Sequence, residues 1–376
     1  MISIKKTLRR MMSIVIGVII LVGLLAFFVL RQPQFGKAPS GERLERIKQS
    51  PNYKDGKFQN LSYTPSFTEG HSMAGEVYQT FFKKHPRKFP TDSIPTLKTD
   101  LLLLHINENM LVWFGHSSYF MQLDGKRFLV DPVLSGSASP LPFGVKAFQG
   151  TDIYAYDDLP EIDYLLISHD HFDHLDYKTI KALQPKIKQV ICGLGVGEHF
   201  EYWGFDPKNI IEKDWNESVV IQDNFTIYTT PARHFSGRSL SRNNTLWMSF
   251  VLDAPSMKIF VGGDSGYDTH FAAIGEQFGP FDLAILENGQ YNEAWRGIHT
   301  MPEDFMKVVK DLQAQKVFPV HSSKFVLARH PWDEPLIKIS ELCQATQTPL
   351  ITPMIGEKVR LNDPTQTLTA WWKGVN

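Results

Sequence analysis

Apolar positions along this chain follow two contrasting patterns. Residues 11–30 form one uncharged run, whereas from residue 111 onward the apolar positions come in short segments separated by turn residues. An Asp124-Gly125 pair between two such segments predicts a β-hairpin, because both residues accept the positive φ angles of a two-residue turn. Further strands are expected near residues 163–167, 190–191, 225–230, 245–252, 257–262, 281–286 and 317–320, and helices near 177–183, 198–203 and 300–313.

This order of elements predicts the fold class. Strands and helices alternate in two successive sets, which favours an α/β protein with two sheets face to face and helices outside. The last of these helices is expected to open with a capping box formed by Thr300 and Glu303. With 376 residues, of which 43% are apolar, the chain is long enough for one enzyme-sized domain.

The uncharged run at residues 11–30 predicts a membrane span, because a helix of this length rises about 30 Å, the hydrocarbon thickness of a bilayer. A cleaved signal peptide is the alternative. Its apolar core is shorter, about 7–15 residues, and ends in small residues, whereas this run ends in Phe-Phe-Val-Leu-Arg. We therefore expect residues 1–31 to be a cytoplasmic stub and a retained transmembrane anchor, in a bacterial inner membrane with the domain that follows on the periplasmic side.

Residues 32–105 are rich in Pro, Gly, Ser and charge, which is typical of an arm that packs on the following domain, residues 106–376. Phe81, Phe82 and Phe89 stand among basic residues and are candidates for contact with lipid headgroups. A solvated loop that covers the core is the alternative interpretation of this stretch.

A cluster of three histidines and two aspartates, His169 to His174, directly follows the strand expected at residues 163–167. Imidazole and carboxylate groups are the ligands that divalent transition metals prefer. The same logic applies to other strand ends, where His234, Asp264 and His321 each follow an apolar segment. Together these positions predict a metal site on one rim of the sheets.

Cysteine content and charge narrow the function classes. Cys192 and Cys343 are not in a CxxC pair and are expected to be buried apolar residues, with a disulfide between them left open. The net charge of −1 provides no field that would collect nucleic acid, so no nucleic-acid partner is expected. A homodimer is left open.

The chain resembles the metallo-β-lactamase superfamily. Its signature His-x-His-x-Asp-His is present as His169, His171, Asp173 and His174. Four longer segments resemble the branch of phospholipases D that hydrolyse N-acylphosphatidylethanolamine: residues 114–118 (Phe-Gly-His-Ser-Ser), 131–135 (Asp-Pro-Val-Leu-Ser), 167–176 and 263–267 (Gly-Asp-Ser-Gly-Tyr).

This resemblance implies a four-layer αββα sandwich with two zinc ions at one rim. It implies that one ion is bound by His169, His171 and His234, that the other is bound by Asp173, His174 and His321, and that Asp264 bridges them. Asp173, Asp264 and His299 are the expected catalytic residues. Two divalent ions against two carboxylates leave a positive centre, which favours an anionic ester as substrate, and no serine or cysteine nucleophile is then required.

Three further residues near the expected site have open roles. His299 is expected on the metal-bearing rim, where it would contact a phosphate or protonate a leaving group, with a slightly lowered pKa from the following helix. A local hydrogen bond is the alternative. Asp170 is expected to orient a histidine, and His116 either supports the site or is structural.

The function expected is that of a membrane-anchored binuclear zinc phosphodiesterase, which cleaves N-acylphosphatidylethanolamine to N-acylethanolamine and phosphatidic acid. Its partners would be the phospholipid, or another anionic phosphodiester, and the membrane. A lactonase or phosphodiesterase for a soluble phosphorylated metabolite is one alternative. A non-catalytic, metal-stabilised scaffold at the membrane is another.

Overall fold

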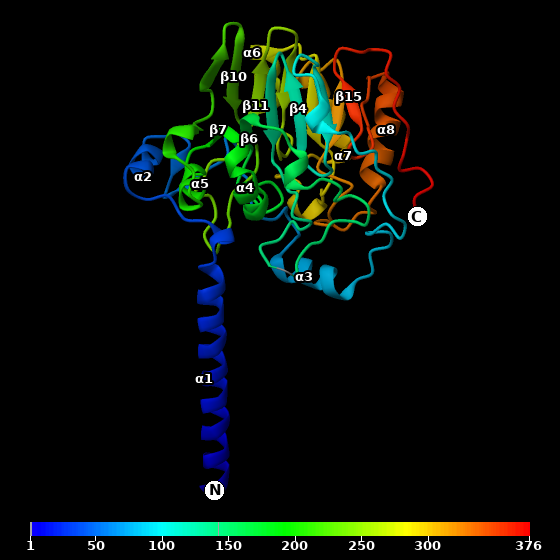
Figure 1. The fold of residues 1–376 in the computed structure, drawn as a ribbon. Coiled ribbons are helices and arrows are strands. Elements are labelled where there is room, and N and C mark those ends of the chain that lie inside the picture. Colours follow the sequence, from blue (N-terminus) through cyan, green and yellow to red (C-terminus); the bar gives the residue numbers. More distant parts are fainter. Residues whose placement is uncertain (1, 142) are drawn as a thin grey trace.

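A computed structural model describes residues 2–141 and 143–376 and shows two mixed sheets packed face to face (Figure 1). The first sheet, here the β3–β8 sheet, has the strand order β15-β3-β4-β5-β6-β7-β8. The strands are β3 Met110–Trp113, β4 Tyr119–Leu123, β5 Lys126–Val130, β6 Ile162–Ile167, β7 Ile187–Gly193, β8 Ile210–Lys213 and β15 Lys358–Arg360.

The second sheet, here the β9–β14 sheet, has the order β14-β13-β12-β11-β10-β9. Its strands are β9 Ser218–Gln222, β10 Phe225–Thr230, β11 Ser249–Asp253, β12 Lys258–Val261, β13 Leu283–Glu287 and β14 Val317–Val320. The strands that lead to the ligand candidates run in one direction within each sheet. In one sheet β5 and β6 are parallel; in the other β12, β13 and β14 are parallel, and β10 has the direction of β12 because both pair antiparallel with β11. Their carboxyl ends therefore meet at one rim.

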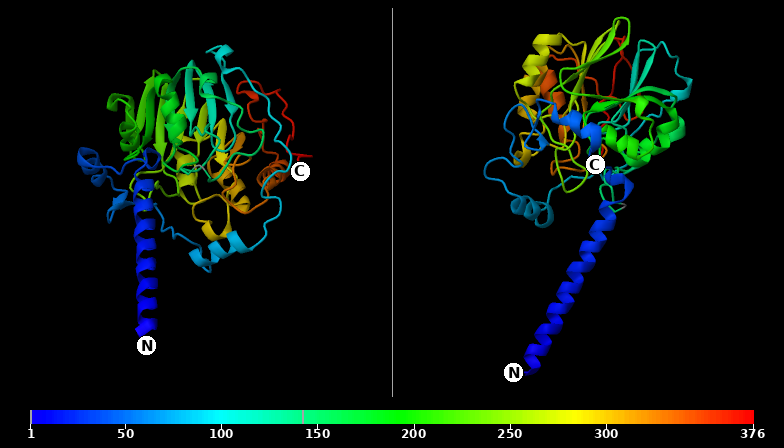
Figure 2. Two further views of the ribbon diagram at one scale, coloured as in Figure 1. Left: turned by 60° about the horizontal axis from the view of Figure 1, so that its bottom comes forward. Right: turned by 90° about the vertical axis from the view of Figure 1, so that its left-hand side faces the viewer.

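Apolar side chains fill the space between the sheets and the space outside each of them. Between the sheets, Trp113 packs edge-on against Phe318, with ring centroids 6.4 Å apart, and Phe128 packs against Phe225 at 5.7 Å. Two helices cover the outer face of the β3–β8 sheet and three cover that of the β9–β14 sheet, within the described residues. These helices are α4 Tyr177–Leu183, α5 Gly197–Tyr202, α6 His270–Phe278, α7 Pro302–Asp311 and α8 Glu334–Thr346. The predicted αββα sandwich is thereby confirmed (Figure 2).

The predicted hairpin is also confirmed. Asp124 has φ 48° and Gly125 has φ 75°, and the pair joins β4 to β5. The predicted capping box is wrong. Thr300 does not cap α7, because its hydroxyl donates to the carbonyl of Ser265, and the residue at the N-cap position is Met301. Cys192 and Cys343 are buried, as expected; the disulfide that was left open does not form, because the two thiols lie in different layers of the sandwich.

Before the sandwich, helix α1 Ile2–Leu30 projects away from the domain (Figure 1). Its segment Lys6–Leu30 has a mean hydropathy of 3.1 over its most apolar part, and none of that part is buried against the domain. The side chains of residues 1–5 and 9, where part of the expected cytoplasmic stub falls, lie outside the described residues. Length and composition fit a membrane span, and a signal sequence has the same pattern.

The segment 32–105 crosses the surface of the sandwich and contributes to its core. It contains α2 Gly41–Lys48, the small hairpin β1 Tyr53–Lys54 and β2 Lys57–Phe58, and α3 Met73–Phe82. Ile47, Phe58 and Ile94 are fully or almost fully buried in the core between the sheets. Arg43 binds three carboxylates of the domain, those of Glu198, Glu201 and Glu212.

Candidate metal centre

Three imidazoles converge on one point at the rim. His169 and His171 follow β6, and His234 follows β10 after a short turn. Nδ1 of His171 lies 2.8 Å from Nε2 of His169 and 3.2 Å from Nε2 of His234. Burial lowers the pKa of all three rings, so they are neutral at pH 7 and have lone pairs to offer. This His169–His171–His234 set can hold one metal ion.

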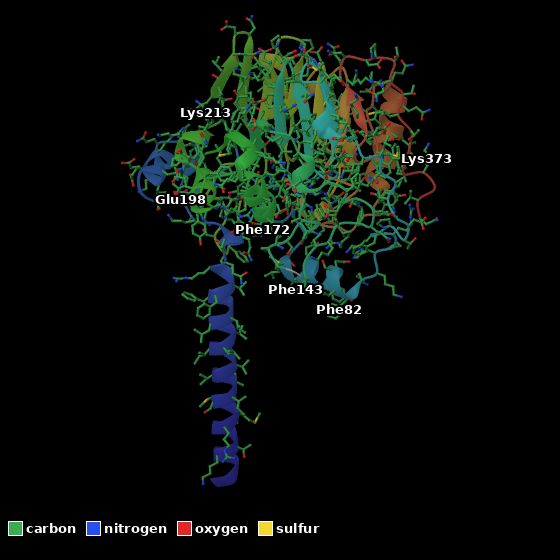
Figure 3. All side chains as sticks on the ribbon, in the orientation of Figure 1. Phe82, Phe143, Phe172, Glu198, Lys213 and Lys373 are labelled. Carbon is green, nitrogen blue, oxygen red and sulfur yellow. The ribbon has the colours of Figure 1, made fainter. Side chains whose placement is uncertain are left out.

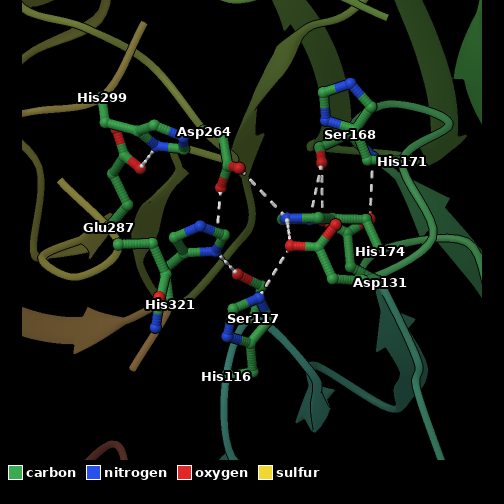
Figure 4. A network of polar contacts seen from close by, with 12 residues as sticks. His116, Ser117, Asp131, Ser168, His171, His174, Asp264, Glu287, His299 and His321 are labelled. Atoms are coloured by element: carbon green, nitrogen blue, oxygen red, sulfur yellow. Dashed lines mark hydrogen bonds and ion pairs between the residues drawn. The ribbon is translucent and has the colours of Figure 1, made fainter. Parts of the chain in front are cut away.

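A second set of ligand atoms lies beside the first. Asp173 and His174 come from the same loop after β6, and His321 follows β14. Their side chains gather with that of His116, and one nitrogen or oxygen of each lies within 4.8 Å of the others. Figure 4 shows His174 and His321 on either side of the Asp264 carboxylate.

Asp264, which follows β12, lies between the two sets. Its Oδ2 is 3.2 Å from Nε2 of His174 and 3.7 Å from Nε2 of His234, while its Oδ1 is 3.1 Å from Nδ1 of His321. One carboxylate thus faces nitrogens of both sets. A carboxylate in this position can bridge two cations.

The donor atoms fit divalent cations better than they fit one another. Among the described residues, Nε2 of His321 is buried without a hydrogen-bond partner, and Nε2 of His174 faces Oδ2 of Asp264 at 3.2 Å without the geometry of a hydrogen bond. Burial alone would lower the pKa of His174, but the carboxylates of Asp264 and Asp173 raise it well above its usual value. The site therefore demands positive charge, and a metal ion supplies it while leaving the imidazole nitrogens free to bind.

Further side chains hold the ligands in orientation. Oδ2 of Asp131 lies 2.8 Å from Nδ1 of His174, the hydroxyl of Ser117 lies 2.9 Å from Nδ1 of His321, and Nδ1 of His234 lies 2.8 Å from the carbonyl of Ile298. These contacts fix the ring planes and tautomers. Asp131 and Ser117 were not predicted to support the site, although Asp131 also directly follows a strand, β5.

The open roles of His116 and Asp170 can now be assigned from their contacts. Nε2 of His116 lies 2.9 Å from Oδ2 of Asp173, so His116 supports the site. Asp170 was expected to orient a histidine of the site. This prediction is wrong, because its carboxylate forms no hydrogen bond with any of the ligand candidates. Its carboxylate instead contacts His199, Thr245 and the backbone N–H of Gly237.

Two site residues adopt the left-handed backbone conformation. His116 has φ 54° and His321 has φ 67°, values that cost free energy for residues other than glycine. Their backbones bond to each other: the N–H of His321 donates to the carbonyl of His116 at 3.0 Å, and the N–H of His116 donates to the carbonyl of Ser322 at 2.9 Å. The turn after β3 and the turn after β14, which belong to different sheets, are thus held to each other by two backbone hydrogen bonds.

His299 lies at the rim, as predicted, and contacts a residue that the sequence analysis did not single out. Its Nδ1 is 2.6 Å from Oε2 of Glu287, the last residue of β13. Burial alone would lower the pKa of His299, but the Glu287 carboxylate raises it above its usual value. The predicted lowering by the helix is therefore wrong. Burial in turn raises the pKa of Glu287 to about 7.

Asp264, His299 and two members of each ligand set line a cavity of about 430 Å³; the four ligands are His171, His234, Asp173 and His321. Apolar side chains also line it, namely Phe67 from segment 32–105, Phe235, Trp295 and Leu327. Two cations, Lys57 and Arg242, also lie on the lining. A cavity with this lining can take a molecule that has both an anionic and an apolar part.

Residues 34–37, which follow α1, pack against the loop after β6 and its neighbours. The carbonyl of Gln34 accepts hydrogen bonds from buried Arg238, which also donates to the carbonyls of Asp170 and Leu175. The backbone N–H of Lys37 donates to Nδ1 of His199 at 3.0 Å. Gly36 makes this approach feasible, because a Cβ there would meet His199 at 2.2 Å.

Comparisons with known proteins agree with this geometry. A family model described as Beta-lactamase superfamily domain matches residues 126–322. The solved structure of Igni18, a metallo hydrolase from the archaeon Ignicoccus hospitalis, superposes with a TM-score of 0.51 at 19% identity, over 67% of this chain and 97% of that one. The two share their fold.

Two curated relatives are similar over most of their own length. An uncharacterised protein of Mycobacterium tuberculosis is 37% identical over 333 residues, which cover 87% of this chain and 88% of the relative. The N-acyl-phosphatidylethanolamine-hydrolyzing phospholipase D 1 of Caenorhabditis elegans is 32% identical over 263 residues, which cover 65% of this chain and 74% of that enzyme.

Proposed function

The chain belongs to the metallo-β-lactamase superfamily and is a metal-dependent hydrolase with relatives among the phospholipases D, and from that premise we propose its substrate. We propose that it hydrolyses N-acylphosphatidylethanolamine to N-acylethanolamine and phosphatidic acid. The reaction takes up one water molecule and breaks the phosphorus–oxygen bond on the ethanolamine side.

One observation carries the proposal: members of both ligand sets face a cavity whose lining contains cationic and apolar side chains. Lys57 and Arg242 suit the phosphodiester or the neighbouring anionic headgroups, and the wall with Phe67, Trp295 and Leu327 suits an acyl chain. A soluble sugar phosphate has no acyl chain to fill this apolar part of the lining. The printed name of the worm relative supports the same substrate.

We propose two zinc ions as cofactors. His169, His171 and His234 would hold one, Asp173, His174 and His321 would hold the other, and Asp264 would serve both. When bound, a pair of divalent ions lowers the pKa of water and neutralises charge on phosphodiester oxygens. The residues of the chain do the rest: Asp131, Ser117 and Ile298 keep the imidazoles oriented, and the apolar wall excludes water from the acyl part.

His299 is the proposed proton donor. Its ring lines the cavity while Nδ1 is held by Glu287, which leaves Nε2 as the nitrogen for the substrate. The raised pKa keeps a proton on the ring near neutral pH, where the departing N-acylethanolamine oxygen requires one. Asp173 and Asp264 are catalytic in the sense that they hold the reactive centre.

For localisation, we propose that α1 is a retained single-pass anchor in a bacterial inner membrane, with the sandwich on the periplasmic side. Support comes from the length and hydropathy of Lys6–Leu30 and from the basic residues before residue 11. An enzyme held in this way has its phospholipid substrate in the same membrane.

The test is turnover of N-acylphosphatidylethanolamine in vesicles by the full-length, zinc-loaded protein, with products identified by mass spectrometry. We expect N-acylethanolamine and phosphatidic acid in equal amounts, and loss of both with His171→Ala. Phosphatidylethanolamine without the N-acyl chain is the matched substrate control. Hydrolysis of soluble phosphate esters or lactones in the absence of lipid turnover would overturn the proposal.

A further inference from the structure

Helix α3 has an apolar face that nothing in the described chain covers. Ser72 caps its start, with the hydroxyl oxygen accepting from the N–H of Gly75 at 3.2 Å. The apolar residues recur at helical spacing, so they share one face, and all are exposed: Met73, Val77, Tyr78, Phe81 and Phe82. Phe81 is 76% exposed and Phe82 is 74% exposed, values that are unusual for phenylalanine on a surface in water.

The opposite face of α3 is tied to the domain by a buried charge. Glu76 is buried, with its carboxylate 2.5 Å from Arg329 and 2.9 Å from Nδ1 of His71. The helix thus has its acid inside and its phenylalanines outside, the reverse of a helix on a water-exposed surface. Rotation to hide the apolar face would break the buried Glu76–Arg329 ion pair, so the pair favours the outward orientation.

The position of α3 indicates what covers this face. Figures 1 and 2 show α3 at the same end of the domain as α1 and level with the point where α1 meets the domain. Phe143, which is 82% exposed, lies at that end too (Figure 3). Lys83 and Lys84 follow α3 directly and are exposed, as is typical of helices that meet anionic headgroups.

We propose that α3, together with Phe143, docks on the surface of the lipid bilayer that α1 spans. The inference takes the membrane position of α1 from the proposed function and does not depend on the substrate. The apolar face enters the boundary between headgroups and acyl chains, and the lysines bind anionic lipid. A second attachment besides α1 fixes the tilt of the sandwich on the membrane.

Arg329, which pairs with Glu76 of α3, also contacts the lining of the cavity. The Arg329 guanidinium lies 5.6 Å from the ring centroid of Trp295, and Trp295 lines the cavity. Arg329 also donates to the side-chain oxygen of Asn292 at 3.2 Å. Docking of α3 therefore holds the apolar part of the cavity at a set distance from the lipid.

The experiment is depth measurement by lipid quenching on the full-length protein in nanodiscs that contain anionic lipid. A single cysteine is introduced as Phe82→Cys, labelled with an environment-sensitive dye, and exposed to spin-labelled phospholipids. Cys192 and Cys343 are buried, so the dye reacts at the new site. Val220→Cys is the matched control; it is 73% exposed and lies on β9, which pairs with β10 at the end of the domain away from α1 (Figure 1). Leu21→Cys within α1 is the positive control.

We expect the label at 82 to lose at least half of its emission to the lipid quencher, the label at 21 to behave likewise, and the label at 220 to be unaffected. Quenching at 21 without quenching at 82 would overturn the docking of α3 and leave the anchor intact. Absence of quenching at both sites would overturn the docking and the anchor together. A blue-shifted but unquenched label at 82 would place a protein surface, such as a second copy of this chain, on α3 and would overturn the proposal.

A second measurement separates docking from catalysis. The double variant Phe81→Ser, Phe82→Ser should lower turnover of vesicle lipid by about tenfold, while hydrolysis of a soluble phosphodiester, bis(p-nitrophenyl) phosphate, and zinc content stay unchanged. An equal loss on both substrates would show that α3 matters for the fold rather than for lipid contact. If the proposed lipid substrate is wrong, the quenching result stands by itself.

Discussion

Nδ1 of His299 lies 2.6 Å from Oε2 of Glu287, and this contact fixes which nitrogen of the ring is free. The other oxygen of Glu287 accepts from the backbone N–H of Ser265 and that of Thr300. Glu287 therefore holds three segments at once: the residue after Asp264, the start of α7 and the imidazole itself.

His299→Ala should keep two metals per chain and lose about 100-fold or more in turnover, the size of effect expected for a lost proton donor or charge stabiliser. The check is kcat on vesicle substrate alongside metal analysis. Loss of metal together with activity would place His299 among the ligands, and unchanged turnover would return it to a local structural role.

Glu287→Gln should shift the pH profile. The charged carboxylate raises the pKa of His299, whereas burial lowers it, so a neutral amide leaves the ring with a lower pKa. Because His299 must be protonated to donate its proton, kcat of this variant should fall at a lower pH than kcat of the wild type. We expect the high-pH limb of kcat to move toward acid with metal content unchanged, and a profile that keeps its shape would contradict the role of Glu287.

Asp264→Asn should lower metal content and reduce turnover by about 100-fold or more, because the amide removes the negative charge that faces both ligand sets. Metal per chain is measured by mass spectrometry after dialysis. Asp223→Asn, at the exposed turn between β9 and β10, is the control and should match the wild type. Full occupancy and full activity in Asp264→Asn would refute the assignment.

Two truncations should distinguish the role of the anchor α1 from that of residues 32–40, which pack against the loop after β6. A chain that starts at Gln32 keeps the contacts of Gln34 and Lys37 and should be soluble and metal-bound. A chain that starts at Gly41 loses the acceptor for Arg238 and should be less stable by about 1–3 kcal/mol, the cost of a buried charged donor without its partner. Equal melting temperatures for the two would contradict this.

His270 should make the stability of the metal-free protein depend on pH. Burial lowers its pKa to about 4, so between about pH 6.5 and 4 the unfolded chain binds a proton that the folded one does not. Stability present above pH 6.5 is lost as the pH falls, by about 3 kcal/mol at pH 4. The check is the free energy of unfolding in urea at pH 7 and pH 4. Between these two pH values His270→Gln should lose about 3 kcal/mol less of this free energy than the wild type. Equal losses in the two proteins would argue against the role of His270.

The ligand candidates could be predicted because each directly follows an apolar strand, and parallel strands bring their carboxyl ends to one rim. His234, Asp264 and His321 are brought together in this way although more than fifty residues separate His234 from the cluster at His169 to His174. The supporting residues could not be predicted, because Glu287 and Ser117 are ordinary polar residues until the sheets pack. The orientation of α3 depends on a long-range pair, Glu76 with Arg329, that no local pattern reveals.

The ligand candidates come from loops of both sheets, so they are synthesised at different times. The histidine loop after β6 leaves the ribosome early, but the three-imidazole set needs His234 and the second set needs His321, near the end of the sequence. A nascent chain that ends before residue 321 has the three-imidazole set but not the complete second set. Binding of both metal ions therefore becomes possible only late in synthesis, after β14 and the loop that follows it have been made.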